Sequence, residues 1–153
     1  MMEFKPVIFR IGEEEYGVDI TVVRGIENML PIVKVPNAGR HIKGIINLRG
    51  DVIPVFSLRS KFHLPEVATT DNTKLIIAQT ERFRLALEVD MVDEIQNISE
   101  EMVHPAPLII KGKETNYVDK VININGKLVV IVNAENLLTD DEKKEIEEIL
   151  NQE

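Results

Sequence analysis

Short runs in which large apolar residues alternate with polar or small ones constrain this chain more than any other feature of its sequence. Along Phe83–Val89 every second residue is large and apolar, which is the period of a strand with one buried face. Comparable or fully apolar runs recur at Val7–Ile11, Tyr16–Ile20, Ile32–Val35, Ile42–Leu48, Val52–Phe56, Lys74–Gln79, Val121–Ile124 and Lys127–Val132. About nine or ten short strands at this spacing predict an all-β barrel or sandwich.

Turn-forming residues between these runs predict how the strands connect. Asn125-Gly126 lies between two of them, and both residues tolerate positive φ, so this pair predicts a hairpin. Gly50-Asp51 predicts a tight turn between two further strands. The short connection Thr80–Arg82 predicts another hairpin.

One polar loop, Pro65–Thr73, separates two strand-rich halves of the chain. We expect two small barrels that share an interface within a single domain over residues 1–153. The first barrel is expected over approximately 14–66 and the second over 73–138, with the N-terminal strand contributing to the second.

The end of the chain predicts a helix over residues 139–151. Thr139 and Glu142 have the spacing of a capping box, in which each side chain binds a backbone N–H group left free at the helix start. Ile146, Ile149 and Leu150 form one apolar stripe. Since short helices are marginal alone, we expect this stripe to dock on the body of the protein.

Charge is distributed unevenly along the chain. The net charge is -8, and residues 139–153 carry seven acids against two lysines. Residues 34–61 reverse the sign, with six basic residues against the single acid Asp51. This basic stretch can attract an acidic partner, or folding can place acids from elsewhere beside it.

The sequence contains no recognisable catalytic or cofactor motif. It has no cysteine, which excludes disulfides and thiolate chemistry. His41, His63 and His104 lack the spacing of metal ligands, and no glycine-rich phosphate loop is present. Few aromatic residues and an acidic composition argue against nucleic-acid binding. We therefore expect no enzyme activity, no metal and no cofactor.

The longest apolar run is Leu128–Val132, far short of the roughly 20 residues that span a bilayer. The first residues carry charge where a secretory signal would be apolar. We expect a cytoplasmic protein without direct membrane insertion.

The stretch Gly44–Arg59, which reads GIINLRGDVIPVFSLR, closely resembles the central motif of CheW-like chemotaxis coupling proteins. The resemblance extends over nearly the whole chain. The segments that carry it outside the motif are Tyr16–Ile20, Val35-Pro36, Leu85–Asp90, Pro105–Pro107 and Tyr117–Leu138.

This resemblance implies two intertwined five-stranded SH3-like barrels followed by a C-terminal helix. It also implies an adaptor that joins the cytoplasmic tip of transmembrane chemoreceptors to the regulatory domain of the histidine kinase CheA, at membrane-bound receptor arrays. Two alternatives remain: an adaptor of the same type in a surface-motility or developmental pathway, and a small-ligand-binding β-barrel.

The resemblance also implies which residues meet each partner. The implied receptor-binding residues are Arg49, Val23, Gly44, Asn47 and Gly50. Arg49 can instead form an internal ion pair with Asp51 or another acid, and Val23 can belong to the core.

For the kinase, the implied contacts are Leu108, Ile109 and Tyr117. The chain departs from the family pattern at three positions. Gly25 stands where glutamate is common, and Ser57 where aspartate is common, which weakens a charge partner expected for Arg59. Lys120 stands where glycine is common.

Overall fold

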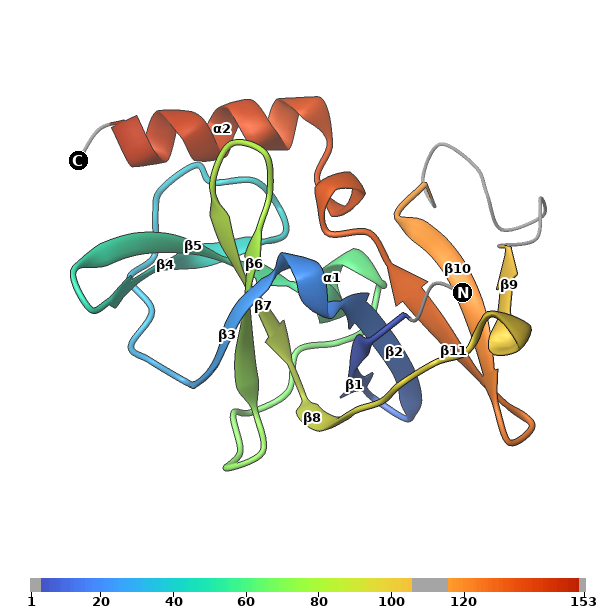
Figure 1. Ribbon diagram of the computed structural model, residues 1–153. Coiled ribbons are helices and arrows are strands. Elements are labelled where there is room, and N and C mark those ends of the chain that lie inside the picture. Colours follow the sequence, from blue (N-terminus) through green and yellow to red (C-terminus); the bar gives the residue numbers. More distant parts are fainter. Residues whose placement is uncertain (1–3, 106–115, 152–153) are drawn as a thin grey trace.

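The computed structural model of the protein describes residues 4–105 and 116–151, and its strands form two sheets (Figure 1). The strands of the six-stranded sheet, in spatial order, are β8 (Met91–Ile95), β1 (Pro6–Ile11), β2 (Glu14–Asp19), β11 (Lys127–Val132), β10 (Val118–Ile124) and β9 (Val103–Pro105). Those of the five-stranded sheet are β3 (Val23–Asn28), β6 (Lys74–Gln79), β7 (Arg84–Val89), β5 (Asp51–Ser57) and β4 (Ile42–Leu48). The helical segments are η1 (Ile20–Val22), α1 (Leu58–Lys61), η2 (Glu100–Met102), η4 (Glu135–Leu137) and α2 (Asp140–Asn151).

The two halves are intertwined. The N-terminal strand β2 pairs in parallel with the C-terminal strand β11, and the whole five-stranded sheet is formed by the chain between them. Strands β6 and β7 pair with β3 and β5, so strands from both sides of the loop Pro65–Thr73 share one sheet. The loop Pro65–Thr73 therefore connects two strands of the same sheet. Long-range strand pairing, and not the polarity of a loop, decides where one half of the fold ends and the other begins.

Three apolar clusters fill the two halves and the space between them. Inside the five-stranded half lie Ile46, Ile53, Val55, Leu75, Ile77 and Ala86. Inside the six-stranded half lie Ile8, Ile98, Ile122, Val129 and Ile131. A larger shared cluster, which includes Phe9, Phe56, Leu87 and Ile146, joins both sheets to α2. This arrangement confirms the expected pair of small barrels, and the short strand β9 raises one sheet from the expected five strands to six.

One expected strand is nearly absent. Within Ile32–Val35 only Val33 pairs, through an isolated bridge to Ile45 of β4. Pro31 and Pro36 flank this segment, and because proline has no N–H to donate, it cannot extend a ladder. The segment therefore lies beside the sheet edge without forming a strand.

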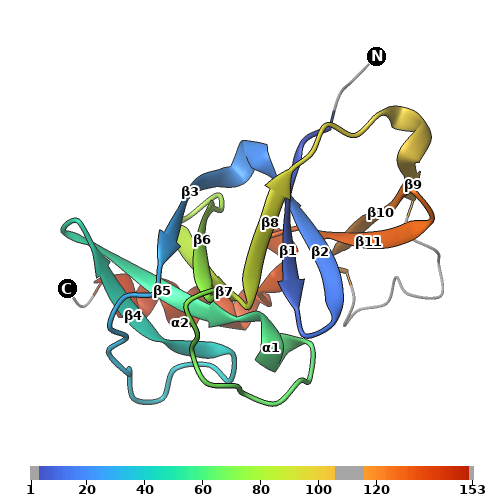
Figure 2. The ribbon, with the colours of Figure 1, turned by 90° about the horizontal axis from the view of Figure 1, so that it is seen from below.

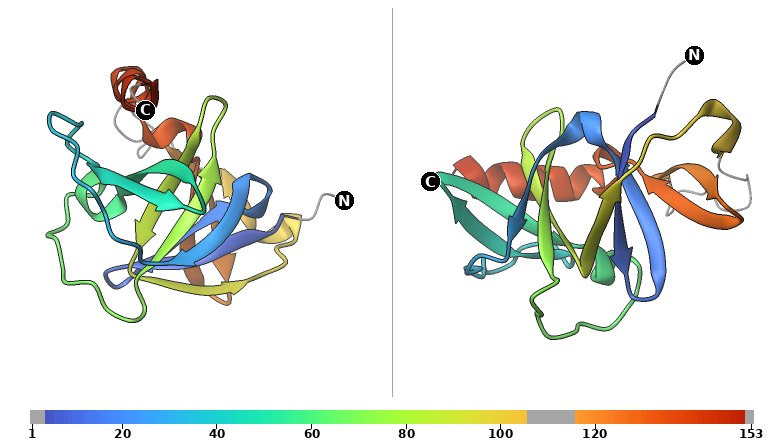
Figure 3. Two further views of the ribbon diagram at one scale, coloured as in Figure 1. Left: turned by 90° about the vertical axis from the view of Figure 1, so that its left-hand side faces the viewer. Right: turned by 60° about the horizontal axis from the view of Figure 1, so that its bottom comes forward.

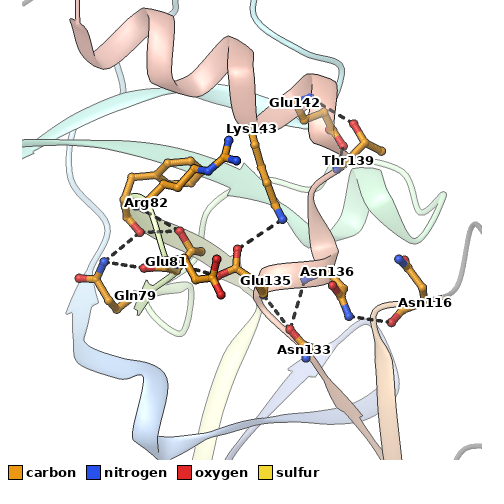
Figure 4. A network of polar contacts seen from close by, with 12 residues as sticks. Gln79, Glu81, Arg82, Asn116, Asn133, Glu135, Asn136, Thr139, Glu142 and Lys143 are labelled. Atoms are coloured by element: carbon orange, nitrogen blue, oxygen red, sulfur yellow. Dashed lines mark hydrogen bonds and ion pairs between the residues drawn. The ribbon is translucent and has the colours of Figure 1, made fainter.

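The C-terminal helix begins as the sequence predicts. Thr139 N donates to Glu142 Oε1 at 2.9 Å, and Glu142 N donates to Thr139 Oγ1 at 3.1 Å (Figure 4). Ile146 is fully buried, and α2 lies across the five-stranded half (Figures 1 and 3). Lys143 reaches from α2 to Glu135 in η4 at 3.4 Å. The helix therefore docks on its own body, as expected.

Among the residues that the structure describes, no helix is long and apolar enough to cross a membrane.

Candidate partner-binding site at the β4–β5 hairpin

The turn that joins β4 to β5 holds an arginine in an unusual backbone conformation. Leu48 pairs with Asp51, so the two residues between them form the loop. Arg49 has φ 50° and Gly50 has φ 94°, as in a type I′ turn, whose twist matches that of the flanking strands. The turn is therefore centred on Arg49-Gly50, one residue before the predicted Gly50-Asp51.

A second hairpin in the same molecule has the same construction. The β10–β11 turn has φ 53° at Asn125 and φ 87° at Gly126. Gly126 N donates to Asn123 Oδ1 at 2.8 Å. In the β4–β5 hairpin Gly50 N likewise donates to Asn47 Oδ1 at 2.8 Å. Asn47 thus stabilises the turn, a role that the sequence interpretation did not assign to it.

The two turns differ at their first loop position. Asparagine tolerates the left-handed conformation found at Asn125, whereas a residue such as arginine there costs roughly 1–2 kcal/mol. Arg49 occupies that position in the β4–β5 hairpin. The tips of the two hairpins lie at opposite ends of the molecule (Figures 1 and 2). Of these two turns, only the β4–β5 turn has an arginine at its first loop position.

The Arg49 side chain is 74% exposed and contacts Glu27 of β3, with 2.6 Å between Nη2 and Oε1. Asp51 instead pairs with Arg84 at 3.5 Å. The internal ion pair considered from the sequence is therefore present, but its acid is Glu27. A guanidinium has five N–H donors, and this single contact leaves most of the group open to solvent.

Strand β3 carries a bulge that decides which of its side chains lie near Arg49. The register shifts between Val23, opposite Ala78, and Gly25, opposite Ile77. Val23 lies before the bulge and packs on the shared cluster. A bulge changes the face toward which the residues after it point. Glu27 lies opposite Leu75, which belongs to the inner cluster of the five-stranded half. The structure thus places Val23 against the core and gives Arg49 a different neighbour, Glu27.

Gly44 is buried and serves chain packing. Its φ is 153°, and a Cβ there would lie 2.2 Å from the Val33 carbonyl oxygen. The close approach of Val33 to Ile45 beside it depends on this missing side chain. Of the five implied receptor residues, Arg49, Asn47 and Gly50 therefore meet at the hairpin tip, while Gly44 and Val23 lie away from it.

Of the three residues implied for kinase binding, the structure describes only Tyr117. Leu108 and Ile109 lie outside the described residues. Tyr117 is half-buried at the end of a row of aromatic rings, 5.6 Å from Phe62, which in turn stacks on Tyr16 at 4.8 Å. Burial raises the pKa of the Tyr117 hydroxyl. Its ring thus joins α1 to the six-stranded half.

Each departure from the family pattern has a structural setting. Ser57 caps α1, because Ser60 N donates to Ser57 Oγ at 3.1 Å. Arg59 pairs with the Asp90 carboxylate, 2.9 Å from its Nε, so it has a charge partner although position 57 is a serine. Lys120 lies over the Phe4 ring, with its ammonium 4.2 Å from the ring centre.

The basic stretch 34–61 is partly offset by acids from elsewhere. Lys43 pairs with Glu88 at 3.0 Å, Arg59 with Asp90 and Arg49 with Glu27. Folding therefore neutralises three of its six basic side chains, and Arg49 is the most exposed of these three. Over residues 4–105 and 116–151, no group of three or more histidine or acidic side chains could hold a metal ion.

These observations define the class of the protein: a two-barrel β protein with an exposed, charged hairpin tip. A profile of the CheW-like domain matches residues 5–142. The chemotaxis protein CheW of Klebsiella aerogenes is 31% identical over 136 residues, which are 89% of this chain and 82% of the relative. The chemotaxis protein CheW of Bacillus subtilis is 29% identical over 141 residues, which are 92% of this chain and 90% of the relative.

Solved structures agree with the sequence relatives. The crystal structure of the scaffolding protein TtCheW from Thermoanaerobacter tengcongensis matches with a TM-score of 0.83 at 30% identity, covering 92% of this chain and 96% of that chain. The chain belongs to the CheW-like domain family, and its function is that of a chemotaxis coupling adaptor. The resemblance drawn from Gly44–Arg59 is thereby confirmed.

Proposed function

We propose that this adaptor joins the cytoplasmic tip of a chemoreceptor to the regulatory domain of the histidine kinase CheA at a membrane-bound array, and that Arg49 makes a receptor contact. The proposed receptor contact rests on the exposure and the backbone conformation of Arg49. Its guanidinium is exposed, and its backbone is held left-handed at the tip of a hairpin. Conformations of this kind persist where function favours the residue despite its conformational cost.

The chemistry of a guanidinium suits such a contact. Its planar fork of donors can bind carboxylates bidentately, and it can also donate to the carbonyl oxygens that end a helix or line a turn. Asn47 fixes the turn from within the hairpin, so the base of the Arg49 side chain is held in place. A fixed base reduces the conformational entropy that binding must remove.

The second hairpin supplies a matched pair of variants. Arg49→Asn gives the first turn the residue that the second turn already has, and thus removes the guanidinium while keeping the turn. Asn125→Arg makes the reverse change at the opposite end of the molecule. We expect Arg49→Asn to weaken binding of a receptor signalling tip about tenfold or more, since charged hydrogen bonds contribute about 1.5–3 kcal/mol.

Isothermal titration calorimetry with a receptor tip from the same source measures this difference. Asn125→Arg should bind that tip like the unchanged protein. Unchanged affinity in Arg49→Asn would remove Arg49 from the receptor contact. Co-elution with the CheA regulatory domain tests the kinase side, for which Leu108, Ile109 and Tyr117 remain our predicted contacts.

A further inference from the structure

The ion pair between Glu27 and Arg49 connects the two outer strands of the five-stranded sheet. Strands β3 and β4 are the two outer strands of that sheet. Glu27 lies on β3, and Arg49 directly follows β4. The contact of 2.6 Å between Arg49 Nη2 and Glu27 Oε1 therefore links the two edges of the sheet.

The two partners differ in how firmly their surroundings hold them. The Glu27 side chain is 23% exposed, whereas the Arg49 side chain is 74% exposed. A strand residue opposite Leu75 has little freedom to move, while a long exposed arginine samples many rotamers. The Glu27 side chain is thus the less mobile partner, and its contact restricts the orientation of the Arg49 side chain.

We infer that Glu27 is a positioning residue that holds the Arg49 guanidinium in the orientation needed for the receptor, an inference that rests on the proposed role of Arg49. Glu27 engages Nη2, so the other guanidinium donors stay available to a partner. Through Glu27, the rotamer of Arg49 is selected before the partner arrives, and less freedom is lost on binding.

Two effects of the Glu27 carboxylate oppose each other. Its charge offsets part of the attraction between Arg49 and an acidic partner, but this effect acts through solvent and is screened by salt. Its hydrogen bond restricts several side-chain torsions of Arg49, which is a direct gain for any partner that needs that one orientation. We therefore expect positioning to outweigh competition, and loss of the carboxylate to weaken binding.

Gly25 provides a way to move the carboxylate without moving Arg49. Gly25 precedes Glu27 by two residues, and both face the inner cluster after the bulge. A Cβ at Gly25 would meet nothing closer than Glu27 Oε1 at 3.8 Å, and its backbone is not left-handed. A glutamate at position 25 thus has room beside the place that the Glu27 carboxylate now occupies.

The test compares four variants for binding to a receptor signalling tip by calorimetry. Glu27→Gln should bind about fivefold more weakly, because binding must then remove part of the Arg49 side-chain entropy that the Glu27 contact had already removed. Adding Gly25→Glu to Glu27→Gln should restore at least half of that loss in binding free energy. Asp51→Asn is the matched control, because it makes the same change of charge beside the same turn but removes a partner of Arg84. It should bind within about twofold of the unchanged protein, as an exposed ion pair contributes little.

The fourth variant, Arg49→Asn, separates this inference from the proposed function. If Arg49→Asn binds weakly while Glu27→Gln binds as well as the unchanged protein or better, Arg49 remains a contact and positioning by Glu27 is overturned. If Arg49→Asn binds normally, the proposed contact fails and the inference fails with it. An independent readout is the NMR signal of the Arg49 Nη2–H₂ group, which donates to Glu27. Its exchange with water should speed up in Glu27→Gln and slow again when Gly25→Glu is added.

Discussion

The Arg49→Asn substitution also makes a prediction about stability that does not depend on any partner. Arg49 has φ 50°, a conformation that costs an ordinary L-residue roughly 1–2 kcal/mol. Asparagine reduces that cost, because its short polar side chain bonds locally to the backbone. Against this gain stands the loss of the ion pair with Glu27. Arg49 is largely exposed, so this pair contributes about 0.2–1 kcal/mol.

The balance of these terms favours the variant slightly. We expect Arg49→Asn to leave the free energy of unfolding unchanged or to raise it by up to about 1 kcal/mol. For a chain of this length, that corresponds to a Tm increase of about 0–4 °C. Asn125→Arg should lower the free energy of unfolding by about 1 kcal/mol, because it introduces the left-handed arginine into the second turn.

Urea denaturation followed by far-ultraviolet circular dichroism measures both variants under one condition. The slope of the transition should not change, since neither substitution alters the surface exposed on unfolding. A loss of more than about 1 kcal/mol in Arg49→Asn would refute the reasoning. It would mean that the Glu27 pair holds the hairpin together and that the backbone of Arg49 is not strained.

Three further predictions concern the fold. Gly44→Ala should lower the free energy of unfolding by about 2–5 kcal/mol in urea denaturation, since its Cβ would meet Val33 O at 2.2 Å, whereas Gly25→Ala should be neutral or stabilising. Burial alone would raise the pKa of Asp90, but hydrogen bonds from Arg59 and the Gly12 amide outweigh it and lower that pKa. This stabilisation is present above about pH 4 and is lost as the pH falls through the lowered pKa, so Asp90→Asn should cost about 2 kcal/mol at pH 7 and flatten the acid limb of the stability curve. Thr139→Ala should cost about 1 kcal/mol by removing the cap of α2, which a thermal melt detects.

Local sequence signals predicted the local structure of this chain well. Except for Ile32–Val35, the predicted runs became strands, Asn125-Gly126 became a hairpin turn, and Thr139 with Glu142 capped α2. Each of these depends on neighbours within a few residues, whose geometry is set by backbone sterics and short hydrogen bonds. The one-turn helix α1 was not predicted, because four residues give too short a period to recognise.

The candidate site shows where local reasoning ends. The motif directed attention to Arg49, but its ion-pair partner Glu27 was not predicted, because 22 residues separate the two in the chain. The sequence held one hint: the acid Glu27 lies two residues after Gly25, the position where glutamate was expected. The sequence left Val23 open between a neighbour of Arg49 and a core residue, and the structure packs it on the shared cluster, before the bulge in β3.

The sequence by itself determined the class of fold, the turns, the helix cap and membership of the CheW-like family, because these follow from residue types at short range. The tertiary structure alone decided which strands share a sheet and which acid meets Arg49. Pairing between β2 and β11, between β3 and β6, and between Glu27 and Arg49 joins residues far apart in the chain. Such contacts form only when burial of three apolar clusters brings the strands together, and no local pattern records that outcome.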